Sequence, residues 1–269
     1  MTINQKLNKV KELKDFLITD LIYFEYCGHE GKSISYPDYD FFANDYLKFA
    51  EYELFIIKDK HIDQDKIHLI NCISHLKRAI HCSIDTFLYV LRLDFFKQKN
   101  LGFISKLNFL KDIGVFNSFS LSRFNKIRNR MEHEYKAPVI EDIEVYFDLT
   151  SAFVAILDSL SLSISNCYEI EFILEKQDKF DFFKMGYTLK DDKPVIKCSL
   201  ERNISNDFED KDVNSKINEG ECSNKDKCSH FKINVTTSET EEFVFFLKVL
   251  IFLIKNSNHI ESQYIKELL

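Results

Sequence analysis

The chain has 269 residues, of which 45% are apolar but only 6 are Gly and 3 are Pro, and its formal net charge is −7. So few turn-forming residues exclude collagen-like and low-complexity classes and disfavour an all-β sandwich or barrel. The negative net charge excludes a polybasic nucleic-acid coat but leaves room for a local basic site.

The N-terminus has no apolar h-region of the kind that secretory signals carry. The longest apolar run, residues 243–254, is shorter than the roughly 20 residues that span a bilayer, so it predicts a buried helix. The seven cysteines are scattered and odd in number, which is typical of reduced thiols rather than of a disulfide framework. We therefore expect a cytoplasmic protein without a membrane segment.

Apolar residues recur at steps of three and four through the first 165 residues, which is the pattern of amphipathic helices. The segment 28–40 interrupts this pattern and is predicted to be a loop that exposes Tyr36 and Tyr39. His68 is expected to be exposed at the start of a long helix. The expected helices are 7–24, 42–54, 63–99, 103–113 ending at Gly114, one that Pro138 ends, and 143–165.

The composition changes near residue 166, where alternating apolar segments separated by polar turns indicate strands. A polar loop is expected at about residues 202–229. Thr237 or Ser238, together with Glu241, resembles a capping box before a final helix. The expected strands are 168–175, 180–190, 194–201 and 231–237. The sequence thus predicts a mainly α protein, with a helical domain over residues 1–165 and a small α+β accessory domain over residues 166–269.

One segment, residues 122–138, differs in charge from the rest of the chain. Between Arg123 and Lys136 it has five basic and two acidic residues, a local net charge of +3 in an acidic protein. Arginine binds phosphate, and histidine transfers protons near neutral pH. The candidate site residues are Arg128, Asn129, Arg130, Glu132, His133 and Tyr135.

Arg128, His133 and Tyr135 follow the spacing Arg-x4-His-x-Tyr. This segment resembles the motif of the HEPN superfamily of small helical bundles, in the form found in toxins paired with minimal nucleotidyltransferase antitoxins. The resemblance covers roughly residues 1–165 and implies a HEPN-like helical bundle there. It also implies metal-independent RNA cleavage, a homodimer with a composite site, and a cognate antitoxin or regulatory protein. Such a partner would modify Tyr135.

The chemistry also follows from the residue types. RNA supplies its own nucleophile, the 2′-hydroxyl, so cleavage needs proton transfer and stabilisation of negative charge. His133 can transfer the proton, which is typically worth roughly 10²–10⁴-fold in rate. Arg128 offers a permanent planar charge that matches phosphate oxygens. Asn129 would orient the histidine or bind phosphate, and Arg130 and Glu132 are expected to support the site.

Helix geometry limits how these residues can cooperate. Five steps along an ideal helix place Arg128 and His133 about 140° apart, whereas Asn129 and His133 share a face. Either Arg128 lies at an irregular helix start, or a two-fold dimer brings two motifs together. The expected activity is a toxin or antiphage endoribonuclease, and residues 166–269 would sense a trigger, bind a partner or gate the site.

Other interpretations of the segment remain open. Arg128–Glu132 and Arg130–Glu134 are i,i+4 pairs that would also suit a solvated helix face with no catalytic role. A non-catalytic HEPN-like module that binds nucleotides or RNA, or serves as an interaction scaffold, is the first alternative, and an antitoxin-like regulatory partner is the second.

A weaker candidate is a metal site in the polar loop. Cys222, Cys228 and His230 are zinc-ligand types, but their spacing is not that of a standard zinc site. Cys198 or Glu221 would have to supply a fourth ligand, and free thiols are the alternative. The sequence has no P-loop, GxGxxG, HExxH or GxSxG motif, so we expect no cofactor.

Overall fold

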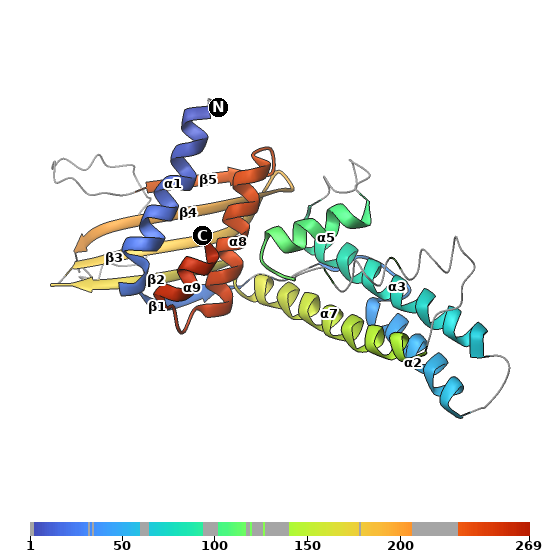
Figure 1. Ribbon diagram of the computed structural model, residues 1–269. Helices are drawn as coiled ribbons and strands as arrows, with labels where there is room; N and C mark the ends of the chain where they lie inside the picture. Colours follow the sequence, from blue (N-terminus) through green and yellow to red (C-terminus); the bar gives the residue numbers. More distant parts are fainter. Residues whose placement is uncertain are drawn as a thin grey trace.

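The computed structural model describes residues 3–31, 33, 35–59, 65–93, 102–116, 119, 126, 140–177, 179–205 and 231–269. Within these residues the protein has a helical region and a sheet region (Figure 1). The helical region consists of α2 (Ala43–Asp59), α3 (Asp65–Val90), α5 (Phe103–Asp112) and α7 (Ile140–Asn166). The helices of the sheet region are α1 (Ile3–Thr19), the short 3₁₀ helix η1 (Leu21–Tyr23), α8 (Thr240–Asn256) and α9 (Ser262–Leu268).

The sheet of the described residues has five antiparallel strands that pair in chain order. They are β1 (Glu25–Glu30), β2 (Glu169–Lys176), β3 (Lys179–Lys190), β4 (Lys193–Ser205) and β5 (Phe231–Thr236). β1 and β2 are neighbours in the sheet although the whole helical region lies between them in the sequence. The helical region is therefore an insertion between two adjacent strands.

One face of the sheet carries the core of the sheet region. α1, α8 and α9 lie on this face, as Figure 1 shows. The Phe16 ring on α1 packs against Phe183 of β3 with centroids 4.4 Å apart, and Tyr187 contacts Phe243 of α8. Strand alternation explains this arrangement, because side chains two residues apart on β3 point to the same face.

Contacts at the end of α3 join the two regions. The Tyr187 hydroxyl on β3 donates to the Leu91 carbonyl at 2.5 Å, just beyond α3, where Arg92 adopts a left-handed conformation with φ 52°. The backbone N–H of Tyr168 donates to the carbonyl of Glu30 at 2.6 Å, so β1 meets the end of α7. A single cluster of buried apolar residues continues through both regions.

In the helical region, α2 and α3 pair along their length, and α7 packs beside both. Small side chains allow the three helices to approach closely, because Ala43, Ala79 and Val154 form one buried cluster. The Asn44 side chain donates to Asp158 at 3.0 Å, which fixes the start of α2 against α7.

The expectation of a mainly α protein, with a HEPN-like bundle before a small α+β domain, is wrong. A five-stranded antiparallel sheet organises the described chain. β1 is one of its strands, and α1 packs on its face. The apolar face of α1 was predicted correctly, but periodicity does not say which partner covers that face. β1 was missed because its sequence, EYCGHE, has no apolar alternation. The division into residues 1–165 and 166–269 stays a prediction.

Most other expected elements are confirmed, with shifted ends. α3 is shorter than the expected 63–99 helix, and β4 extends to Ser205, past the expected start of the polar loop. α8 begins after Glu239, whose side chain makes no capping bond, so the predicted capping box is wrong. α9 was not predicted. The rest of the loop to residue 229 lies outside the described residues.

In the described part of the chain, one helical segment is long and apolar enough to cross a bilayer by length and composition. It is Ile143–Ile164 of α7, with mean hydropathy 1.5, and 39% of the segment is buried. The core helix of a soluble protein passes the same test, and α7 contributes Phe153, Leu157 and Leu160 to the core. The residues 243–254, expected to form a buried helix, lie in α8.

Candidate functional site

The predicted site residues Arg128, Asn129, Arg130, Glu132, His133 and Tyr135 all lie outside the described residues. The described residues Phe116 and Ile140 flank the segment that carries the motif. The Phe116 ring packs on Phe153 of α7 with centroids 5.1 Å apart, and α7 begins at Ile140. These two points on α7 are 13 residues apart, or about 20 Å along a helix. The chain that carries the motif therefore starts and ends beside the same helix.

A second group of polar residues lies on one face of α3. They recur at steps of three and four, so they form a continuous stripe that faces α2 and the loop before it. We call this stripe the α3 polar face. It consists of His68, Asn71, His75, Arg78, Cys82 and Asp85.

Glu53 of α2 holds the first turn of the α3 polar face. His68 Nδ1 donates to Glu53 Oε2 at 2.5 Å, and the Asn71 amide donates to Glu53 Oε1 at 3.2 Å. The side chains of His68 and Glu53 are only 23% and 14% exposed. The expectation that His68 is simply an exposed residue at a helix start is wrong.

His75 lies one to two turns further along, and its surroundings disfavour its protonation. Burial lowers the pKa of His75, the Arg78 charge lowers it further, and Glu53 partly opposes both. Its ring contacts Phe49 of α2 edge-on, with centroids 5.5 Å apart. Among the described residues its buried Nδ1 has no hydrogen-bond partner. Beside it, burial raises the pKa of the Cys72 thiol to about 12, which rules this thiol out as a nucleophile near neutral pH.

An open pocket lies at the other end of the α3 polar face. It has a volume of about 550 Å³ between α3 and the loop before α2. Arg78 has no ion pair among the described residues, whereas Asp85 is bound by Lys106 of α5 at 2.6 Å. We call it the Arg78 pocket, and it is lined by Asp38, Tyr39, Asp40, Phe41, Tyr46, Arg78, His81, Cys82 and Asp85.

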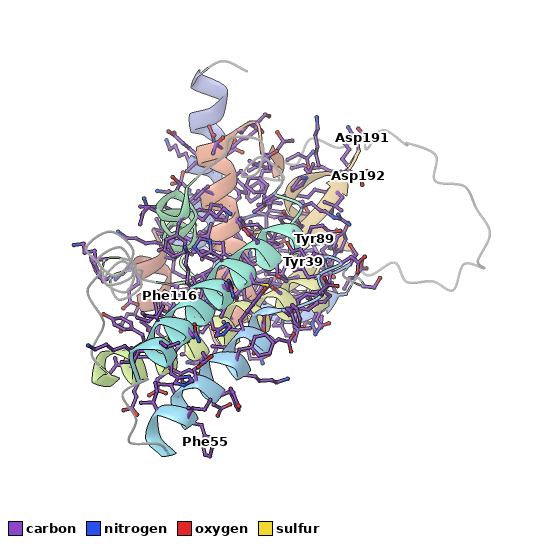
Figure 2. All side chains as sticks on the ribbon, turned by 90° about the vertical axis from the view of Figure 1, so that its right-hand side faces the viewer. Tyr39, Phe55, Tyr89, Phe116, Asp191 and Asp192 are labelled. Atoms are coloured by element: carbon purple, nitrogen blue, oxygen red, sulfur yellow. The ribbon has the colours of Figure 1, made fainter. Side chains whose placement is uncertain are left out.

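Aromatic rings give the Arg78 pocket its second property. Tyr39 is only partly exposed, and burial and the Asp85 charge raise the pKa of its hydroxyl, which stays protonated at neutral pH. Figure 2 shows Tyr39 next to Tyr89 beside α3. His81 is stacked on Phe103 of α5 with centroids 4.7 Å apart. A guanidinium beside planar rings suits a ligand that has both a flat ring and an anionic group.

The described residues contain no group of three His, Cys, Asp or Glu side chains that could hold a metal ion. The predicted loop candidates Cys222, Cys228 and His230, and the proposed fourth ligand Glu221, lie outside the described residues. The other fourth-ligand candidate, Cys198, is 1% exposed in the core, and burial raises the pKa of its thiol.

Sequence reasoning missed the role of Glu53 and the continuity of the α3 polar face. A polar residue at every third or fourth position of an otherwise apolar helix was visible in the sequence. The partner on α2 was not, because the register of two helices depends on their packing. No protein-family model matches the chain, and comparisons with curated proteins and with solved structures gave no match either.

Proposed function

We propose that the protein is a metal-independent endoribonuclease that cleaves RNA through Arg128 and His133. The observation that carries the proposal is the spacing Arg128-x4-His133-x-Tyr135 in a segment of local charge +3 within an acidic chain. In this reaction the 2′-hydroxyl attacks the adjacent phosphorus, His133 transfers a proton, and Arg128 neutralises charge that develops on the phosphate oxygens.

The proposed biological role is that of a toxin or antiphage effector. Two chains would supply one composite site, because Arg128 and His133 do not share a face of a straight helix. A cognate antitoxin would silence the enzyme, and nucleotide attachment to Tyr135 is the mode that the resemblance suggests. The proposal rests on the motif and its resemblance to the HEPN superfamily, and not on the fold.

The Arg78 pocket supports a second candidate function, a non-catalytic module that binds RNA or a nucleotide. Stacking on an aromatic ring is worth roughly 1–3 kcal/mol per base, and Arg78 would meet a phosphate. The carboxylates Asp38 and Asp40 at the same pocket would accept hydrogen bonds from the edge of a base.

The test is incubation of the purified full chain with total RNA and with tRNA in EDTA. We expect the wild type to cleave, and His133→Ala and Arg128→Ala to lose cleavage by at least about a hundredfold with an unchanged helical circular dichroism signal. His259→Ala is the matched control, because this histidine is 75% exposed near the C-terminus and contacts Glu261. It should cleave like the wild type.

Undiminished cleavage by His133→Ala would contradict the mechanism. If the wild type does not cleave RNA but binds it, and Arg78→Ala weakens that binding about tenfold or more, the binding module is the better description. Co-expression with the protein encoded next to it, followed by mass spectrometry, tests Tyr135, and an unmodified Tyr135 would count against that mode of regulation.

A further inference from the structure

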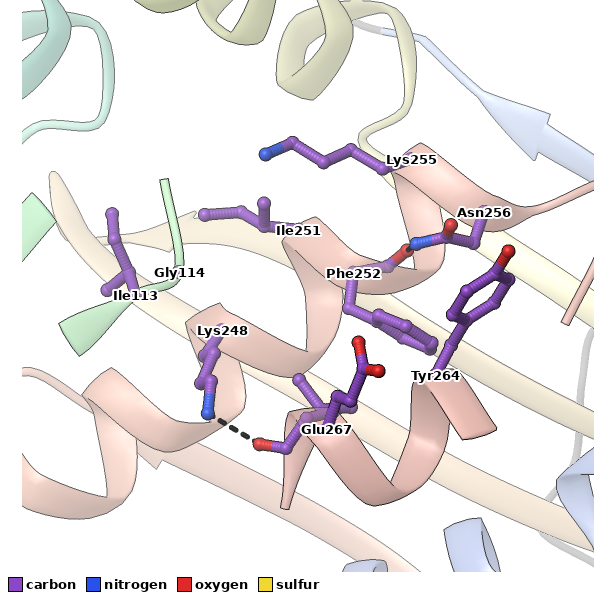
Figure 3. A pocket seen from close by; sticks show the side chains of 10 residues that line it. Ile113, Gly114, Lys248, Ile251, Phe252, Lys255, Asn256, Tyr264 and Glu267 are labelled. Carbon is purple, nitrogen blue, oxygen red and sulfur yellow. Dashed lines mark hydrogen bonds between the residues drawn. The ribbon is translucent and has the colours of Figure 1, made fainter. Parts of the chain in front are cut away.

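A pocket in the sheet region has no role in the proposed function. It lies where α8 and α9 meet the turn that ends α5, and its volume is about 300 Å³, at the lower end of the range for small-molecule sites. Ile113 and Gly114 come from the end of α5, and the other lining residues come from α8 and α9 (Figure 3). The pocket therefore lies between the end of α5 in the helical region and α8 and α9 in the sheet region.

The floor of this pocket is apolar. Ile251 is 2% exposed and Ile113 is fully buried, and Phe252 beside them is partly exposed. Tyr264 of α9 forms one wall, and 39% of its surface remains exposed. An apolar surface with an aromatic wall would bind the hydrocarbon or ring part of a ligand, because burial of that part from water is favourable.

The two lysines of the pocket differ in their partners. Lys248 donates to the carbonyl of Leu268 at 2.5 Å, so its amine ties α8 to α9. Lys255, seven residues later, has no ion pair or hydrogen bond among the described residues. In Figure 3 its side chain extends over Ile251 and points away from Glu267. Glu267 instead accepts a hydrogen bond from Gln263 at 3.2 Å.

The Lys255 amine lies in surroundings that disfavour its charge. Burial lowers the pKa of Lys255, although the residue as a whole is exposed. An anion placed against the amine would offset this loss of hydration. The neighbouring carboxylate, Glu267, does not do so in this structure.

We propose that this pocket binds a small amphiphilic anion, a carboxylate or phosphate monoester on an apolar body, with the anionic group at Lys255 and the body over Ile251 and Phe252. The ligand would contact the turn at Gly114, where φ is 72°, and the end of α8 at once. Gly114 lies 14 positions before Arg128 in the sequence. The inference does not depend on the proposed ribonuclease activity.

The first test is isothermal titration calorimetry of the full chain with three probes. Octanoate and phenyl phosphate carry the two kinds of anion, and octanamide is the neutral analogue of octanoate. We expect at least one anion to bind and octanamide to bind at least about tenfold more weakly. The anion that binds more tightly shows whether the pocket prefers a carboxylate or a phosphate monoester. Equal affinity for octanoate and octanamide, or no binding of either anion, would overturn the proposal.

Variants locate the site. Lys255→Gln should weaken anion binding about tenfold, whereas Lys266→Gln, a lysine of α9 that does not line the pocket, should bind like the wild type. Tyr264→Ala should weaken the binding of both anions and keep the preference over octanamide. If Lys266→Gln weakens binding as much as Lys255→Gln, the effect is one of general charge and the site is not this pocket.

Two further readouts exclude a merely structural effect of the variants. Hydrogen exchange should slow on addition of the anion in peptides that cover both 111–115 and 251–256, the two sides of the pocket. Because the anion binds the charged amine of Lys255, affinity should fall as pH rises, and the fall should begin below the pKa of an ordinary lysine. The other titratable groups that line the pocket are Lys248, Tyr264 and Glu267. Protection confined to other peptides would contradict the assignment.

Discussion

The two regions of the molecule differ in how many phenylalanine rings they leave exposed to solvent. In the sheet region five phenylalanine rings lie in the core at 0–4% exposure, namely Phe16, Phe172, Phe183, Phe243 and Phe246. In the helical region several rings of α2 and its preceding loop face solvent, at 38–64% exposure for Phe41, Phe49, Tyr52 and Phe55. Figure 2 shows Phe55 projecting from α2.

Buried polar atoms without a partner occur in both regions. The hydroxyls of Ser83 on α3 and Thr150 on α7, and the Nε atom of Arg202 on β4, are buried without a hydrogen-bond partner among the described residues. Unpaired buried polar groups cost stability, and exposed rings lose the benefit of burial. These exposed rings make the helical region the less optimised part for stability.

The largest expected effect tests the core of the sheet region. Phe183 is fully buried and contacts both Phe16 and Phe172, so Phe183→Ala should lower the free energy of unfolding by about 3–5 kcal/mol. Phe55→Ala is the matched control on α2 and should change it by no more than about 0.5 kcal/mol. Urea denaturation measures both. A large loss in Phe55→Ala would show that the α2 ring is covered in solution.

The same contrast explains how much of the fold the sequence predicts. β3 was found from FDFFKMGYTLK because its apolar residues alternate, and α8 was found because apolar residues dominate it. β1 was not found, because its strand character comes from pairing with β2 across the whole inserted helical region. Local patterns identify an element but not a partner that is distant in the sequence.

The candidate sites divide in the same way. The Arg128–Tyr135 motif is a local pattern, so the sequence predicts it, while the structure describes only the α5 and α7 segments that flank it. The Arg78 pocket and the pocket between α8, α9 and Gly114 that Lys255 lines each combine residues from separate elements. Neither could be predicted, because the lining elements meet only through tertiary packing. They are α3 and the segment 38–46 in the first pocket, and α8, α9 and the end of α5 in the second.

An intermediate effect is expected for the polar contacts of the helical region. Glu53→Ala removes the acceptor of both His68 and Asn71 and should lower the free energy of unfolding by about 1–3 kcal/mol. Glu51→Ala, two positions earlier and exposed, is the matched control, with a change of at most about 0.5 kcal/mol. A double-mutant cycle of Glu53→Ala with His68→Ala should give a coupling energy near 1 kcal/mol. Additive effects would show that the pair does not stabilise the α2–α3 contact.

The smallest expected effect is a pH dependence confined to the helical region. The folded state lowers the pKa of His75 below its ordinary value of 6.5, so folding disfavours its protonation. The free energy of unfolding is therefore unaffected by His75 above about pH 6.5, and it decreases as pH falls through the pKa of His75 in the folded state. In the sheet region, burial lowers the pKa of Lys184, but the bond to Glu171 and nearby carboxylates outweigh this and raise it above 10.5. That contribution changes only at higher pH.

Hydrogen exchange at about pH 7.5 and about pH 5.5, corrected for intrinsic rates, separates the two regions. Peptides of α2 and α3 should lose protection at the lower pH, and peptides of β3 and β4 should not. His75→Gln removes the titrating group, so in this variant the α2–α3 peptides should no longer respond. Burial raises the pKa of Asp158 on α7 above 3.8, so protonation of this group at low pH favours the folded state, opposite to His75. The lower pH of the experiment is therefore kept well above 3.8. If protection falls equally in both regions, His75 is not the group responsible. The helical region would then be no more sensitive to pH than the sheet region.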